Sequence, residues 1–274
     1  MITRTPPVTR PTEPDHPENP DRLRLGTVAL VAGLICQVPL GVLHPHREYA
    51  NDSVAAFHEY ARSGDWVLVH LGQFLGLMLA TIGLVAMATY LGRQRGPAGF
   101  LGQVAVVTAV VSAAVFAVQM AVDGVALKAA VDTWDAATAT ADRSAAYRVA
   151  ESVRSVEKGL SALFNLINGL TLLSLGLGLS MASGRGRRLG WIAAVAGVGF
   201  IAVGVLTAQT GFSHEATSAA LPATVTLVVF AVGMAFAGRY EDHTDQGGGR
   251  AHCVVGADDP LTCGRAGLSR RADE

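Results

Sequence analysis

The chain has 274 residues, of which 50% are hydrophobic and only 16% are charged. This composition, with a mean hydropathy of +0.37, is typical of membrane proteins rather than of soluble domains. The formal net charge of −1 gives no electrostatic reason to expect a nucleic-acid partner, and Cys36, Cys253 and Cys263 lack the spacing of a zinc site or a disulfide framework.

Residues 1–24 hold six prolines and alternating charges, so they cannot bury a core and are predicted to form a disordered cytoplasmic tail. The apolar run over 25–43 predicts a first spanning helix, which is retained because no A-x-A-like cleavage site ends it. The polar stretch 44–64 follows. Within it, Asp52 and Ser53 are expected to cap a short amphipathic helix.

Further apolar runs predict spanning helices over about 66–91, 100–122, 157–182, 189–208 and 219–238. Helical spacing continues past the third span through 123–137, so that helix is expected to project beyond the bilayer. The Ala-rich polar segment 138–156 is predicted to be a surface helix that can continue into the fourth span, and 239–274 a second disordered cytoplasmic tail. The expected fold is therefore an all-α, six-helix integral membrane bundle over 25–238 with a short extracytoplasmic helical cap.

The predicted second helix has two contrasting faces. Trp66, His70 and Gln73 share one face, because residues three and four apart are neighbours on a helix. A stripe of small residues on roughly the opposite side consists of Gly72, Gly76 and Gly83. Such stripes permit close helix contacts. We therefore expect protein neighbours on both faces, with a second copy of the chain or a membrane partner on the glycine stripe.

Arginines flank alternate ends of the six predicted spans, which places both termini on one side of the membrane. By the positive-inside rule that side is the cytoplasm, and the chain is expected to be a multi-pass protein of the cell (plasma) membrane. Basic residues between the third and fourth spans argue the other way, but their segment is long and also acidic. The flanking arginines are Arg22, Arg24, Arg93, Arg95, Arg185, Arg187, Arg188 and Arg239.

Polar residues within the spans gather toward the outer ends of the second, third and fourth helices. His70 and Asp123 are the pair that packing explains least, because a carboxylate beside an imidazole can relay protons or order a ligand. The sequence predicts either an outward-opening ligand pocket or hydrogen bonds between helices, worth about 0.6–2 kcal/mol each. The pocket would be lined by His70, Gln73, Gln119, Asp123, Glu157, Ser161, Asn165 and Asn168.

Four histidines on the predicted outer side, His44, His46, His58 and His214, are candidate metal ligands. Imidazole and carboxylate ligands suit zinc or copper, yet neither His58 nor His214 has the second histidine of an H-E-x-x-H motif. Solvated loop histidines are the ordinary alternative. A transmembrane haem relay is disfavoured because no predicted helix carries a histidine in its cytoplasmic half. The cofactor therefore stays unknown.

The stretches HPHREYANDSVAAFHEYARSGDWVLVHLGQF and AVDGVALKAAVDTW, with ESVRSVEKG before the fourth span, resemble an uncharacterised bacterial family of multi-pass integral membrane proteins, a domain of unknown function. The resemblance extends over about 25–238. It implies a membrane-helix architecture and no assigned activity. It also puts the recognisable stretches on the outer side, where the polar cluster is predicted.

The function favoured by these patterns is a non-enzymatic integral membrane protein whose outward-facing polar pocket binds or senses a small ligand. The first alternative is a membrane enzyme, or a redox or metal protein, that uses His70, Asp123 and Glu157. The second is a small transporter or an accessory subunit. Transport is disfavoured because no helix is clearly broken and no repeat relates the two halves of the chain.

Overall fold

The structure is a computed structural model of the chain, and it describes residues 20–44, 51–182 and 184–247. Every regular element in these residues is a helix, which confirms the all-α fold. The elements are α1 (Pro20–Leu43), α2 (Ser53–Arg62), α3 (Trp66–Gly92), α4 (Pro97–Ala121), the π-helix η1 (Val122–Leu127), α5 (Lys128–Ala136), α6 (Thr140–Ser180), α7 (Gly184–Thr210) and α8 (His214–Gly247).

Six helical segments among the described residues are long and apolar enough to cross a membrane. The chain is therefore a multi-pass integral membrane protein. The third segment is continuous through α4, η1 and α5, as the helical spacing beyond the third span predicted. The segments are Leu23–Gly41, Trp66–Gly92, Pro97–Ala136, Thr140–Ser180, Gly184–Thr210 and His214–Ala237.

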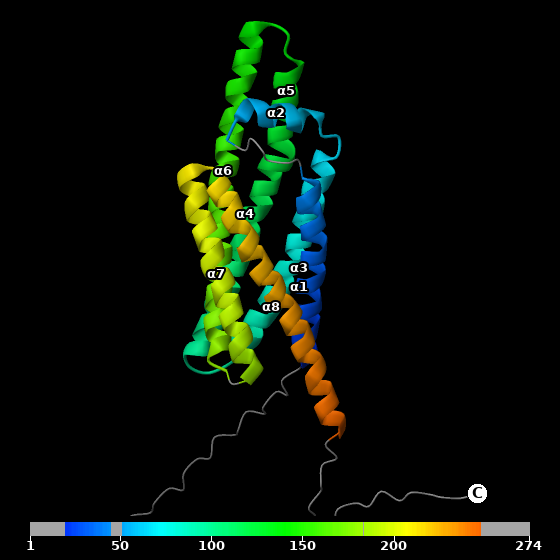
Figure 1. The fold of residues 1–274 in the computed structure, drawn as a ribbon, viewed down its shortest axis with the longest axis vertical. Helices are drawn as coiled ribbons and strands as arrows, with labels where there is room; N and C mark the ends of the chain where they lie inside the picture. The colour runs from blue at the N-terminus through cyan, green and yellow to red at the C-terminus, as the bar shows by residue number, and fades with distance from the viewer. Residues whose placement is uncertain (1–19, 45–50, 183, 248–274) are drawn as a thin grey trace, which may run out of the picture.

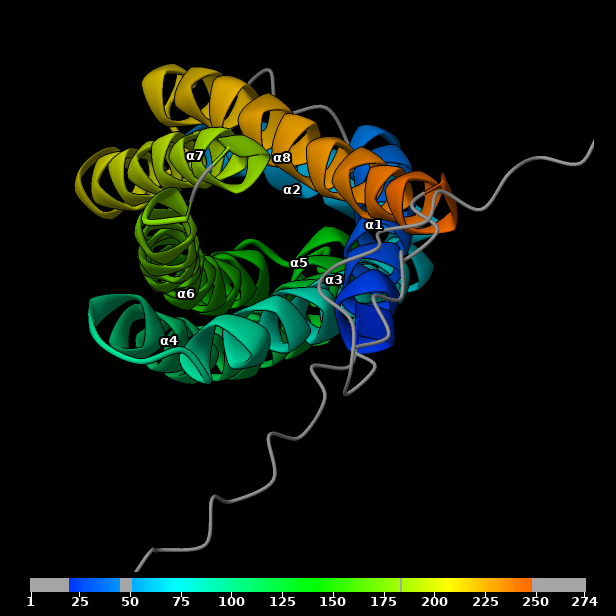
Figure 2. The same ribbon diagram turned by 90° about the horizontal axis from the view of Figure 1, so that it is seen from below.

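The spanning helices form a ring, seen along the bundle in Figure 2. Around it α1, α3, α4, α6, α7 and α8 are successive neighbours, and α8 closes the ring by crossing diagonally to α1 (Figures 1 and 2). The start of α1 and the end of α8 lie at the same end of the bundle (Figure 1), as an even number of spans requires. We call this the terminal end. Its assignment to the cytoplasm rests on the flanking arginines and stays a prediction.

Glycines bring α1 and α3 into close contact. A Cβ atom on Gly33 would lie 2.5 Å from the Gly76 carbonyl oxygen, and one on Gly76 would lie 3.1 Å from that of Gly33. Gly83 faces Gly26 and Leu30 in the same way. The predicted glycine stripe is thus covered by α1 of the same chain. The expectation that a second protein covers it is corrected, because a surface already packed at backbone distance leaves no room for a partner.

The opposite end of the bundle, which we call the cap end, extends beyond the ring through α2, η1, α5 and the start of α6 (Figure 1). The aromatic residues Phe57, Tyr60, Trp66 and Trp134 form its hydrophobic core with Leu127, Val131 and other apolar residues. Asp52 caps α2, since its carboxylate accepts hydrogen bonds from the backbone N–H groups of Val54 and Ala55 at 3.0 and 3.1 Å. The predicted helical cap and its capping residue are therefore present.

Several helix boundaries differ from those predicted from hydropathy. α1 begins at Pro20 rather than near 25, α7 at Gly184 rather than near 189, and α8 at His214 rather than near 219. α6 is continuous from Thr140, so the predicted surface helix and fourth span form one helix, and α8 continues to Gly247 rather than ending near 238. Hydropathy marks where a helix leaves apolar surroundings, but a polar segment without helix-breaking residues continues the same helix into water. The remainder of the two predicted tails, 1–19 and 248–274, lies outside the described residues.

Candidate functional site

A histidine and a carboxylate meet under the cap. The Nε2 atom of His70 lies 3.0 Å from Oδ2 of Asp123, and both residues are almost fully buried, at 2% and 3% exposed. The other ring nitrogen, Nδ1, lies 2.7 Å from the Trp66 carbonyl oxygen. A carbonyl oxygen only accepts, so Nδ1 carries the proton and donates it to Trp66. Nε2 is therefore the nitrogen that is directed at Asp123.

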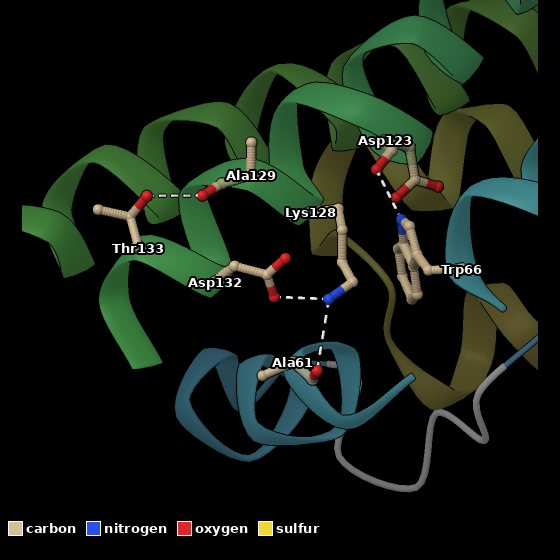
Figure 3. A network of polar contacts seen from close by, with 7 residues as sticks. All are labelled: Ala61, Trp66, Asp123, Lys128, Ala129, Asp132 and Thr133. Carbon is tan, nitrogen blue, oxygen red and sulfur yellow. Dashed lines mark hydrogen bonds and ion pairs between the residues drawn. The ribbon is translucent and has the colours of Figure 1, made fainter. Parts of the chain in front are cut away.

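The π-helix η1 places Asp123 opposite His70. A π turn interrupts the regular i→i+4 hydrogen bonding of a helix and often occurs at functional sites. Here the indole Nε1–H of Trp66 donates to the backbone carbonyl of Asp123 at 3.0 Å (Figure 3). Gly124 lets η1 approach α3 closely, because a Cβ atom there would lie 2.7 Å from Cβ of His70. Trp66 thus holds both the imidazole and the backbone of its carboxylate partner.

A second histidine joins this pair from the end of α1. The ring centroid of His44 lies 5.0 Å from that of His70 and 5.0 Å from that of Trp66. One ligand atom each from His44, His70 and Asp123 lie within 4.8 Å of one another. Around a zinc ion with bonds of 2.0–2.2 Å, tetrahedral neighbours are about 3.4 Å apart. The three groups therefore need to move by little more than 1 Å to share one ion.

Aromatic residues and a buried arginine separate the pair from the cap surface. The ring centroid of Tyr60 lies 4.3 Å from that of Trp66. The guanidinium of Arg154, which is 0% exposed, lies 5.5 Å from the Tyr60 ring centroid and 5.6 Å from that of Phe57. This arrangement is a cation–π contact in a desolvated setting. The positive charge of Arg154 therefore lies against the aromatic residues Tyr60 and Phe57, and Tyr60 in turn packs on Trp66 beside the His70–Asp123 pair.

The structure places a second buried carboxylate at the level of Asp123. α4 and α6 run antiparallel, and the rings of Phe116 and Phe164 face each other with centroids 4.8 Å apart. Asp123 and Glu157 each lie about two helical turns beyond these rings toward the cap, and η1 packs against α6. Glu157 is only 1% exposed. Both carboxylates of the predicted cluster thus face the interior of the cap end rather than lipid.

The other predicted pocket residues divide into two groups. Gln73, Gln119 and Asn168 are buried in α3, α4 and α6. Ser161 and Asn165 are half-buried, and the Asn165 side-chain amide donates to the backbone carbonyl of Ser161 at 2.8 Å within α6. The Asn165 amide is therefore held by the backbone of its own helix.

The remaining predicted histidine ligands do not join His44. His58 is on the cap surface, 3.6 Å from Asp135 and in ring contact with Trp134. His214 is exposed at the start of α8, with Nε2 3.3 Å from the Ser218 hydroxyl. His46 lies outside the described residues. Of the four candidate histidines, His44 is the one that the structure brings together with His70 and Asp123.

Sequence reasoning also missed two contributors to the site, Tyr60 and Arg154. Arg154 was assigned to a solvated surface segment because its neighbours in the sequence are polar. The sequence signal for the burial of Arg154 is its spacing on α6: Ala150, Arg154 and Glu157 recur every three or four residues and are all buried.

Comparison with protein-family models, with curated proteins and with solved structures finds no match for this chain.

Proposed function

We propose that this integral membrane protein binds a divalent transition-metal ion at its cap end, through His44, His70 and Asp123. The observation that carries the proposal is the orientation of His70. Its Nδ1–H donates to the Trp66 carbonyl, so its Nε2 is directed at Asp123 as a ligand atom would be, and His44 offers a further ligand atom within 4.8 Å of the pair. A histidine ligand in metal sites typically has its other ring nitrogen held in this way.

The donor set indicates the class of ion. Two imidazoles and one carboxylate suit zinc, copper or ferrous iron, whereas calcium and magnesium prefer oxygen ligands only. Three protein ligands are also the number found in catalytic zinc sites, where the fourth position takes water or substrate. A bound ion would there act as a Lewis acid.

Cobalt titration of the detergent-purified chain tests this proposal. Chelator-treated protein should bind about one Co²⁺ per chain and develop the absorption of a nitrogen- and oxygen-ligated ion, and Zn²⁺ should displace it. His44→Ala, His70→Ala and Asp123→Ala should each weaken binding at least tenfold. His58→Ala is the matched control, because His58 is a cap histidine outside the cluster. Unchanged Co²⁺ binding in folded His44→Ala would contradict the proposal.

A second candidate is an organic ligand held among the buried polar groups of α4. The Oε1 atom of Gln119 and the Oγ atom of Ser112 are buried and have no hydrogen-bond partner in the described part of the chain. Both lie on the α4 face that carries Phe116. Unsatisfied polar atoms in an apolar interior are costly, so a small polar ligand or water is expected to bind there. Gln119→Leu should then abolish thermal stabilisation by a ligand while leaving Co²⁺ binding unchanged.

A further inference from the structure

A groove runs between α1 and α3 near the terminal end, far from the His70–Asp123 pair along α3. Its volume is about 320 Å³. Its apolar part is lined by Leu25, Gly26, Ile82 and Ala86. The floor is formed by the small residues: a Cβ atom on Gly26 would lie 2.7 Å from Cβ of Ala86. Bulkier residues beside this contact make the walls, so the groove follows from the local sequence.

The groove opens toward lipid. Ile82 is 59% exposed and Leu25 is 68% exposed. Leu84 and Met87, on the other side of α3, are buried in the apolar core of the bundle. Exposed apolar side chains on the outer face of a spanning helix contact the bilayer. The natural neighbour of these walls is therefore a hydrocarbon chain.

The groove becomes polar where α3 leaves the membrane. Thr89, Tyr90 and Arg93 line this part. Thr89 and Arg93 are exposed and lie one helical turn apart, and Arg93 directly follows the last residue of α3. No acidic side chain forms an ion pair with Arg93 among the described residues. Arginine binds phosphate through two parallel hydrogen bonds, so its guanidinium is suited to a phosphodiester.

We propose that this groove binds an anionic phospholipid, with one acyl chain against Leu25 and Ile82 and the headgroup phosphate on Arg93. An apolar groove that ends in a cation at the membrane surface matches the order of chain and phosphate in a phospholipid. Basic pockets between spanning helices on the cytoplasmic side are known to take anionic headgroups. The site is separate from the metal cluster, and the proposal does not depend on that function.

Native mass spectrometry of the detergent-purified full chain, titrated with phosphatidylglycerol or phosphatidylcholine, tests the proposal. Arg93→Gln should weaken phosphatidylglycerol binding about tenfold and remove the preference over phosphatidylcholine, because a charge-assisted contact is lost. Ala86→Leu should weaken binding of both lipids by filling the groove. Arg188→Gln is the matched control, since Arg188 is an exposed arginine on α7 near the same end.

Two results would overturn the lipid site. One is unchanged lipid binding in Arg93→Gln, a surface variant that is expected to fold. The other is displacement of phosphatidylglycerol by inorganic phosphate alone, which would identify an anion site without an acyl chain. Co²⁺ binding by the same Arg93→Gln sample should match the wild type, so failure of the lipid site and failure of the metal site give different results.

Discussion

The two ends of the bundle are built from different chemistry. Toward the terminal end the ring is filled by apolar side chains such as Leu30, Met87, Leu172 and Phe230, with glycines that bring the helix backbones together. Under the cap the interior instead holds His70, Asp123, Arg154 and Glu157, all nearly inaccessible to solvent. The same helices contribute to both ends, so the difference is one of residue type and enclosure rather than of architecture.

This comparison shows how a membrane protein can bury ionisable groups. In hydrocarbon a charge is expensive, and among the residues whose burial the structure describes, the terminal end buries no charged side chain. The cap end extends past the ring and supplies partners of its own: the Trp66 indole, the Trp66 carbonyl, the Tyr60 ring and the π turn at Asp123. Burying a polar group costs free energy unless hydrogen-bonding or charged partners replace the lost water.

Breaking the His70–Asp123 pair should have the largest effect on stability. Asp123→Ala leaves a buried imidazole without its partner, and such changes cost about 3–5 kcal/mol. Replacing both residues, in His70→Leu/Asp123→Leu, should recover part of that loss because the imidazole is removed together with its carboxylate partner. Thermal unfolding in detergent without metal measures both. A double variant as unstable as the single one would show that the pair itself stabilises the fold.

The terminal end should respond to added volume rather than to lost charge. Gly33→Ala would place a methyl group against the backbone of Gly76 and Ala80, which should cost about 1–3 kcal/mol by forcing α1 from α3. Gly41→Ala is the matched control on the same helix, because a Cβ atom there has no neighbour within 4 Å. Its higher helix propensity should make it neutral or slightly stabilising. Equal melting temperatures for the two variants would contradict the close contact of α1 and α3.

The cap should also depend on the start of α2. Asp52→Ala removes the carboxylate that accepts from Val54 and Ala55, and loss of such a cap costs about 1 kcal/mol. Because Tyr60 of α2 packs against Trp66 beside the proposed metal ligands, we expect faster proteolysis of 51–62 and weaker Co²⁺ binding. Asp52→Asn should restore both properties, since asparagine caps helices about as well as aspartate. If Asp52→Ala binds Co²⁺ normally although α2 is cleaved rapidly, α2 is not required at the site.

The smallest effect is expected at the edge of the cap. Lys128 donates to the Ala61 carbonyl at 3.3 Å and to Asp132 at 2.5 Å, which ties α5 to α2 (Figure 3). The Asp132 carboxylate is half-exposed, so Asp132→Ala should change stability by no more than about 0.5 kcal/mol. Lys128→Met should cost more than Asp132→Ala, because it also removes the donor to α2. Differential scanning fluorimetry on the two variants distinguishes these contributions.

Hydropathy was enough to predict the six spans, the helical cap and the extension of the third span. These features depend on properties that each segment carries by itself, namely length, apolar content and a capping residue such as Asp52. The pairing of His70 with Asp123 was also anticipated, because both lie at the same end of their helices. The ligand pocket predicted around them stays a prediction.

The sequence by itself determined that six segments of the described chain are long and apolar enough to span a bilayer and that the polar residues of these segments gather at one end. Bilayer thickness and helix rise convert apolar runs directly into candidate spans. The tertiary structure decided which polar groups meet. His44 joins His70 and Asp123 only because α1 packs along α3 and a π turn rotates Asp123 toward them. The glycine stripe likewise faces α1 rather than a second protein. Helix packing fixes such contacts through the relative rotation and register of distant segments, which no local pattern specifies.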